Sequence, residues 1–103
     1  MKDPLPVEIS ALAAQHIREL EAWWRRNRPA APNAVREELQ RILRFVRMAP
    51  LASRRATDVE LPNVRRVHIK RIWHFLYYRV LDDPERIELL ALWSSSRGEG
   101  PPI

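Results

Sequence analysis

The side chains that could take part in chemistry in this 103-residue chain are three histidines and many arginines. His16, His68 and His74 are spread along the sequence, and no two of them are close enough to share a metal ion on one helical turn. We therefore expect each histidine to be a half-buried or surface residue. We predict no metal site and no cofactor.

The usual sequence signatures of a hydrolase are absent. The chain contains no cysteine, which excludes a thiol nucleophile, a thiolate metal site and a disulfide. It has no Gly-rich phosphate loop and no Gly-x-Ser-x-Gly turn. The serine run 94–96 has no acid and histidine partners nearby and is typical of a polar exit from a strand. The sequence therefore offers little evidence of a catalytic constellation.

Arginine is the better candidate for a functional role, because its guanidinium makes bidentate contacts to phosphate and carboxylate. Arg65 and Arg66 are neighbours in an apolar run, so alternation along a strand places them on opposite faces of a sheet. One of them would lie on a face that helices leave open. Other arginines and aromatic residues could converge with it there: Arg71, Arg79, Arg97, Trp73, Tyr77, Tyr78 and Trp93.

An open face of this kind would suit RNA or an acidic protein groove. The alternative interpretation is that the aromatic side chains belong to the core and the arginines are solvated. Alternation also predicts that Tyr77 and Tyr78 cannot both be core residues. The net charge of +5 and the isoelectric point of about 10.7 favour the same partners, or simply a solvated basic surface.

The sequence gives no sign of a membrane segment. No apolar run approaches the roughly 20 residues that span a bilayer. The segment Met1–Pro4 lacks the long apolar region of a signal peptide. We predict a soluble, cytoplasmic protein without membrane contact.

The candidate residues are positioned by a stretch of strands that runs from Val64 to Trp93. It contains three apolar runs rich in β-branched and aromatic residues, VRRVHI, FLYYRVL and RIELLALW. Asp82-Asp83-Pro84 separates the last two runs and is a turn signal. The stretch predicts a hairpin preceded by a third strand, which together form an antiparallel meander.

The first half of the chain predicts helical cover for this sheet. Pro6–Ser10 is expected to be a short strand, with Ser10 capping a helix over 11–27. After a break with two prolines, a second helix should run to about Met48 in an antiparallel hairpin with the first. Each helix has an apolar stripe, formed by Ala13, Ile17, Leu20 and Trp24 in the first and by Val35, Leu39, Ile42 and Val46 in the second.

The element order β-α-α-β-β-β predicts a two-layer α+β fold, with an N-terminal strand and an antiparallel helical hairpin packed on an antiparallel β-meander. We expect a single domain over residues 1–97 and a flexible C-terminal tail over residues 98–103, where both glycines lie beside two prolines. Met48 lies well outside the helical stripe, and Phe45 lies near its edge. They are either scattered surface residues or a docking patch for a partner helix.

Two segments of the sequence together form one recognisable pattern. They are VEISALAAQHIRELEAWW and RRVHIKRIWHFLYYRVLDDPERIELLALWSSSRG. Its most telling part is the hairpin Phe75–Trp93, in which a YYRV strand leads through an acidic turn into an IELLALW strand. Together these segments resemble the ParE branch of the RelE/ParE toxin superfamily of bacterial toxin–antitoxin systems, over nearly the whole chain. The resemblance implies an α+β toxin and a cognate antitoxin that wraps it with a helical, otherwise flexible C-terminal segment.

In this superfamily, ParE-type members poison DNA gyrase, whereas RelE-type members cleave mRNA on the ribosome with a basic cluster and usually a tyrosine or histidine near the C-terminus. After Arg97 this chain supplies no Tyr, His or Lys, and Ser94 stands where RelE-like relatives often carry a histidine. The resemblance therefore implies a binding protein that is not an enzyme, namely a toxin that inhibits DNA gyrase and is neutralised by a ParD-like antitoxin. A RelE-like ribosome-dependent mRNA endonuclease and a non-toxic basic binding module are the alternatives.

Candidate contact residues follow from this resemblance and from the surplus apolar and basic surface. For antitoxin binding they are Leu12, His16, Trp23, Phe45, Met48, Arg65, Arg79 and Trp93. For toxicity and target binding the candidate is Arg97. We expect no sequence-specific nucleic-acid binding by the toxin alone.

Overall fold

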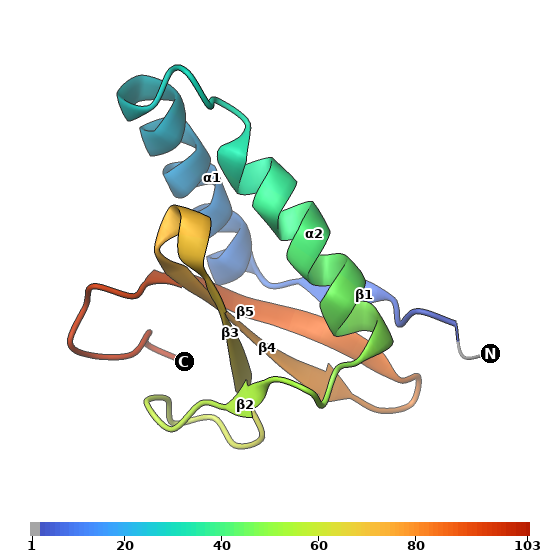
Figure 1. Cartoon of the computed structure of the whole chain (residues 1–103). Helices are drawn as coiled ribbons and strands as arrows, with labels where there is room; N and C mark the ends of the chain where they lie inside the picture. Colours follow the sequence, from blue (N-terminus) through green and yellow to red (C-terminus); the bar gives the residue numbers. More distant parts are fainter. Residues whose placement is uncertain (1–2) are drawn as a thin grey trace.

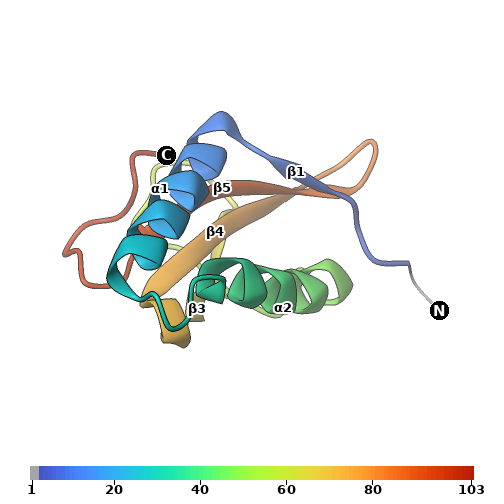
Figure 2. The same ribbon diagram turned by 90° about the horizontal axis from the view of Figure 1, so that it is seen from above.

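The computed structural model describes residues 3–103 and contains a five-stranded sheet with two helices on one face (Figure 1, Figure 2). Met1 and Lys2, which belong to the segment that we predicted to lack a signal peptide, lie outside the described residues. In chain order the elements are β1 (Val7–Ile9), α1 (Ala11–Asn27), α2 (Ala34–Met48), β2 (Arg54–Arg55), β3 (Arg65–Ile69), the 3₁₀ helix η1 (Lys70–Ile72), β4 (His74–Leu81) and β5 (Arg86–Ser94). Over residues 3–103, no helix combines the length and the apolar character that crossing a membrane requires.

The predicted two-layer α+β fold is confirmed, and the predicted meander forms the centre of the sheet. The strand order is β1-β5-β4-β3-β2. Neighbouring strands are antiparallel except for β1, which pairs in parallel with β5 and so becomes an edge of the sheet. At the other edge, the two-residue β2 pairs only with Arg65 and Arg66 of β3. The rest of β3 therefore has an open outer edge.

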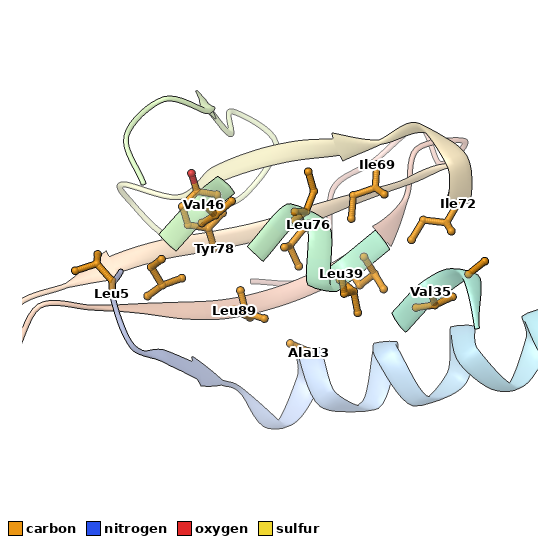
Figure 3. Packing of buried hydrophobic residues seen from close by; sticks show 14 residues of the cluster. Leu5, Ala13, Val35, Leu39, Val46, Ile69, Ile72, Leu76, Tyr78 and Leu89 are labelled. Atoms are coloured by element: carbon orange, nitrogen blue, oxygen red, sulfur yellow. The ribbon is translucent and has the colours of Figure 1, made fainter. Parts of the chain in front are cut away.

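The helices pack as their apolar stripes predicted. α1 begins after Ser10, whose hydroxyl accepts a hydrogen bond from the Ala13 amide at 3.0 Å, which confirms the predicted cap. α2 runs back across the same face of the sheet (Figure 1). Both stripes contribute to a core that includes Leu76, Tyr78 and Leu89 of the sheet (Figure 3).

The opposite face of the sheet is also covered, contrary to our expectation of an open face. Tyr77 and Tyr78 are both fully buried, so the prediction that they cannot both be core residues is wrong. Tyr78 belongs to the core under the helices, whereas Tyr77 packs in a second cluster with Leu90 and Ala91. A β-bulge shifts the register of β4 and β5 between the two tyrosines. Loop and tail residues pack against this second cluster: Ala56, Val59, Leu61 and Ile103.

The tail 98–103 folds back onto this second face. The Trp93 indole Nε1 donates a hydrogen bond to the Glu99 carbonyl oxygen at 2.8 Å, and the Ile103 carbonyl oxygen accepts one from the Glu60 amide at 2.9 Å. Pro101 is buried. The segment contains no helix or strand, but it packs against the sheet. Its flexibility, and the domain boundary at residue 97, stay predictions.

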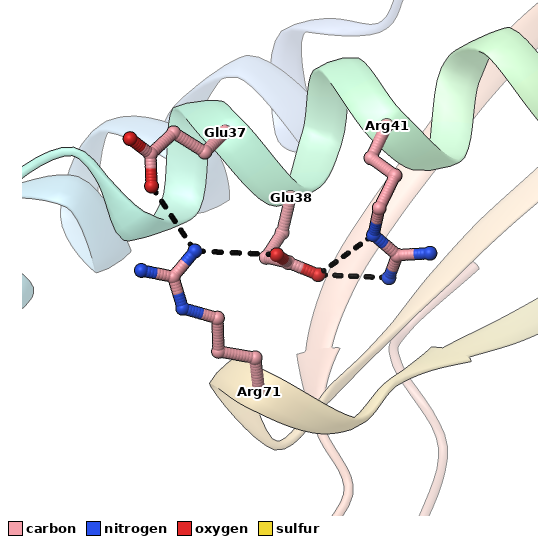
Figure 4. Close-up of polar contacts among 4 residues, drawn as sticks. All are labelled: Glu37, Glu38, Arg41 and Arg71. Carbon is pink, nitrogen blue, oxygen red and sulfur yellow. Dashed lines mark hydrogen bonds and ion pairs between the residues drawn. The ribbon is translucent and has the colours of Figure 1, made fainter.

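An ion-pair cluster ties α2 to the turn between β3 and β4 (Figure 4). The buried Glu38 carboxylate accepts hydrogen bonds from Arg41 Nη2 at 2.8 Å and from Arg71 Nη1 at 3.3 Å. Arg71 also pairs with the exposed Glu37 at 3.0 Å. The hydrogen bond from Arg41, supported by Arg71, lowers the pKa of the Glu38 carboxyl although burial acts to raise it. The ionised carboxylate thus holds η1 against α2.

Candidate functional site

A cleft lies between α1 and the sheet, where β4 begins and β5 ends. It consists of two hollows with volumes of about 400 and 560 Å³. Leu20, Trp23, His74 and Ser94 line both hollows, so the two adjoin. All four tryptophans of the chain line this cleft, which we call the tryptophan cleft: Trp23, Trp24, Trp73 and Trp93.

Trp73 is the most unusual of these tryptophans. It follows η1 in the left-handed conformation, with φ of 55° and ψ of 39°, which is uncommon for a bulky residue. Its carbonyl oxygen accepts hydrogen bonds from Ser95 N and Ser95 Oγ at 2.9 and 2.8 Å, and its amide donates to Lys70 O at 3.2 Å. The side chain nevertheless remains 61% exposed. The turn therefore presents an indole ring to solvent at the rim of the cleft.

Two imidazoles lie in the cleft, and their hydrogen bonds fix different tautomers. His16 Nδ1 accepts a hydrogen bond from the Leu92 amide at 3.2 Å, so we place its proton on Nε2. His74 Nδ1 lies 2.7 Å from Ile72 O, so we place the proton on Nδ1 and leave Nε2 as an acceptor. Burial lowers the pKa of both histidines, and the positive charge of Arg97 lowers it further. Both rings are therefore neutral near pH 7.

Two arginines are stacked on tryptophan rings of the cleft. Arg97 Cζ lies 4.0 Å from the centroid of Trp93, and Arg28 Cζ lies 5.6 Å from that of Trp23. Within residues 3–103, neither guanidinium forms an ion pair with a carboxylate. Their charge is thus available to a ligand.

The structure brings together four of the residues that we had nominated from the sequence. These are His16, Trp23, Trp93 and Arg97. Leu12 is half-buried on α1 and does not line the cleft. Arg65 and Arg79 lie elsewhere and have partners within the domain. Arg65 Nη1 donates to Ser53 O at 2.6 Å, and Arg79 Nε pairs with Glu88 at 2.8 Å.

The predicted convergence of arginines on one open sheet face is wrong. Arg71 belongs to the Glu38 cluster, and Arg97 lies at the tryptophan cleft. Of the predicted set, Arg66 does lie on the second face, opposite to Arg65 as alternation requires. It pairs with Asp58 at 3.2 Å, and the same carboxylate accepts a hydrogen bond from the Tyr77 hydroxyl at 2.7 Å. The protein's own groups therefore occupy that face.

A second exposed surface lies at the end of α2. We call it the apolar shoulder, and it comprises Phe45, Met48 and Leu51, which are 47%, 54% and 67% exposed. Phe45 borders a hollow of about 400 Å³ that also reaches Arg54 and Phe75, and that is lined by residues 66–68 of β3. Phe45 and Met48 of this surface are apolar residues of α2 that do not belong to its buried stripe.

Trp73 and His74 are among the residues of the tryptophan cleft that our nominations missed. Trp73 was expected on the sheet face, and His74 was expected to have no role. The sequence contains no signal for the position of either residue, because composition does not reveal a left-handed conformation at a residue other than glycine. The clue available in hindsight is the segment Lys70–Ile72, which separates two apolar runs without a glycine or proline.

Comparison with known proteins gives the family. A family model described as ParE toxin of type II toxin-antitoxin system, parDE, matches residues 7–98. No curated protein matches the chain. A solved structure described as the chromosomal ParDE TA system from P. aeruginosa is 18% identical, with a TM-score of 0.62, and the match covers 87% of this chain and 95% of that one. The fold is also similar to a mutant of the E. coli toxin RelE in the free state, at 14% identity and a TM-score of 0.59, over 91% of this chain and 86% of that one. Because the family model spans nearly the whole chain, this protein belongs to the ParE toxin family of type II toxin–antitoxin systems.

Proposed function

We propose that this toxin inhibits DNA gyrase, that it acts by binding rather than by catalysis, and that a ParD-like antitoxin neutralises it. The observation that carries the proposal is the match of the ParE family model over residues 7–98. The description of the P. aeruginosa relative as a ParDE system supports an antitoxin of the ParD type. Such a target would place the protein in the cytoplasm.

The second face of the sheet, which we had expected to be open, lacks the groups that RNA cleavage needs. Cleavage of a message requires accessible cations around the phosphate and a general base near it. On this face Arg66 is paired with Asp58, and burial together with the Asp58 hydrogen bond raises the pKa of Tyr77. The tyrosine therefore keeps its proton at neutral pH and is a poor base.

We place the antitoxin on the apolar shoulder. Phe45 and Met48 lie one turn apart on α2 and offer exposed apolar side chains, as an amphipathic partner helix requires. The exposed Arg44 and Arg54 and the net charge of +5 favour an acidic partner. Of our nominated antitoxin contacts, the proposal now rests on Phe45 and Met48, because His16, Trp23 and Trp93 line a different surface.

The gyrase proposal is tested by supercoiling of relaxed plasmid with purified gyrase, with and without the toxin. We expect inhibition, and we expect linear DNA to appear when the enzyme is denatured. If the folded toxin leaves supercoiling unchanged, the proposal fails. Message cleaved in a translating extract would then support the RelE-like endonuclease instead.

The antitoxin proposal is tested by measuring the binding of a purified ParD-like antitoxin to the toxin. The double variant Phe45→Asp, Met48→Asp should bind it about 100-fold more weakly, since each charge replaces an apolar anchor. Trp73→Gly, which alters only the tryptophan cleft, is the matched control and should bind like the unaltered toxin. Equal affinity of the double variant would remove the apolar shoulder from the interface.

A further inference from the structure

The tryptophan cleft concentrates side chains that the proposed function leaves unused. All four tryptophans of the protein and two of its three histidines line it. Trp24 and Trp93 pack against the two hydrophobic clusters, but core packing does not explain Trp23 and Trp73, which are 41% and 61% exposed. Trp73 in addition occupies a left-handed conformation that a smaller residue would adopt more easily. Exposed aromatic rings on a constrained turn indicate a ligand that stacks.

The polar groups of the cleft are arranged for a neutral ring with both donors and acceptors. His16 offers an Nε2–H donor, and His74 offers an Nε2 acceptor. Each imidazole is fixed by a backbone group, so its direction is set before a ligand arrives. A nucleobase edge presents complementary donors and acceptors of this kind.

The charge of the cleft favours an anion. Arg28 and Arg97 are stacked on tryptophan rings without carboxylate partners in residues 3–103. Arg71 also lines the cleft, but Glu37 and Glu38 neutralise it. The wall contains one carboxylate, Glu19, which accepts a hydrogen bond from Gln15 at 2.8 Å. The positive charge therefore exceeds the negative charge.

We propose that the tryptophan cleft binds a nucleotide, with the base stacked on Trp73 and the phosphate held at Arg97. The two hollows, of about 400 and 560 Å³, have the size of small-molecule sites. Stacking platforms beside arginines are the means by which proteins hold single-stranded nucleic acid without reading its sequence. The ligand is either a free nucleoside monophosphate or one nucleotide of a single strand. An acidic peptide is less suited, because both imidazoles are neutral and the apolar anchors for a helix lie on the apolar shoulder.

The test follows the four indole Nε1–H signals of ¹⁵N-labelled toxin during titration with adenosine monophosphate. We expect saturable shifts of the Trp73 and Trp93 signals. Adenosine without phosphate should bind more weakly, and Arg97→Gln should abolish that difference. A short oligoadenylate that binds more tightly per site than the monophosphate would identify single-stranded nucleic acid as the source, whereas equal binding would identify the free nucleotide.

Trp73→Gly is the decisive variant, because glycine suits the left-handed turn and removes only the stacking ring. It should melt close to the unaltered protein and bind the monophosphate about tenfold more weakly. Phe45→Ala, which removes an exposed ring outside the cleft, is the matched control and should bind normally. The proposal is overturned if millimolar monophosphate causes no shifts, if inorganic phosphate causes the same shifts, or if folded Trp73→Gly binds equally well. None of these outcomes depends on whether the toxin inhibits gyrase.

Discussion

At Gly100, the addition of a single carbon atom is expected to push the tail 98–103 away from the sheet. A Cβ there would overlap the Asp58 carbonyl oxygen and lie 2.9 Å from the Asp58 carbonyl carbon. At Gly98, by contrast, a Cβ would have no atom of residues 3–103 within 4 Å other than those of its chain neighbours. Gly100→Ala and Gly98→Ala are therefore a matched pair, since they make the same chemical change in one segment and only one of them creates a clash.

The magnitude of the effect at Gly100 follows from what must move. The overlapping atom belongs to the backbone, so either the tail or the 57–61 loop has to shift. Overpacking of this kind costs about 1–3 kcal/mol. Each kcal/mol lowers the melting temperature of a domain of this size by roughly 4–8 °C, so Gly100→Ala should melt roughly 4–24 °C below the unaltered protein. Gly98→Ala should be neutral or should stabilise by up to about 1 kcal/mol, because it restricts the unfolded chain.

Thermal unfolding followed by circular dichroism measures both variants, and hydrogen exchange of the Trp93 indole reports on the tail directly. That indole donates to the Glu99 carbonyl oxygen in the folded protein, so its proton should exchange faster in Gly100→Ala. Equal melting temperatures and equal exchange in the two variants would refute the reasoning. The tail would then be flexible, as its glycines and prolines first suggested.

Three further predictions concern charged groups. Glu38→Gln should lower the free energy of unfolding by about 1–2 kcal/mol in urea denaturation, a value reduced for the partial exposure of its arginine partners, whereas Glu37→Gln should change it by less than about 0.5 kcal/mol. Because burial lowers the folded-state pKa of His16 and His74, the unfolded chain binds protons first, and stability should fall as pH drops below 6.5. The same pH series on a His16→Asn, His74→Asn variant should show a smaller fall. Arg97→Ala should keep the fold by circular dichroism and lose at most about 1 kcal/mol, since it removes one exposed cation–π contact.

The parts of the fold that local physics determines could be predicted from the sequence. The Ser10 cap and the apolar stripe of each helix depend on residues within a few turns of one another, and both were predicted correctly. The acidic turn between β4 and β5 is equally local, and the hairpin is present. Family membership followed as well, because the resemblance covered nearly the whole chain.

The covering of the second face could not be predicted, because it depends on contacts between residues far apart in the chain. The Ile103 carbonyl oxygen accepts a hydrogen bond from the Glu60 amide, although more than 40 positions separate the two residues in the sequence. Neither residue has a periodic pattern that would indicate this contact. The composition of residues 98–103 instead predicted a flexible tail, since glycine and proline favour irregular structure. The errors about Tyr77 and about the arginines share this cause: alternation was applied correctly, but the face opposite the helices was assumed to be open.

Some residues of the tryptophan cleft had been nominated from the sequence for other roles and some had not, and this difference has a physical reason. His16 and Trp23 lie seven residues apart, which is two turns of one helix. Their spacing alone therefore predicts that both lie on the same margin of α1. Trp73 and His74 join them only because η1 ends in a left-handed residue that turns the chain between β3 and β4. No propensity predicts that turn, and it places the most exposed tryptophan of the protein.

The tryptophan cleft and the apolar shoulder share no lining residue, so their roles can be separated by variants that fold. If the antitoxin covers only the apolar shoulder, then Phe45→Asp with Met48→Asp should lose antitoxin and keep nucleotide binding, whereas Trp73→Gly should do the reverse. The toxin–antitoxin complex should then still bind nucleotide. If the antitoxin also covers the cleft, nucleotide and antitoxin must compete, and by linkage each should weaken the other by the same factor. Titrating the complex with adenosine monophosphate therefore distinguishes one antitoxin surface from two.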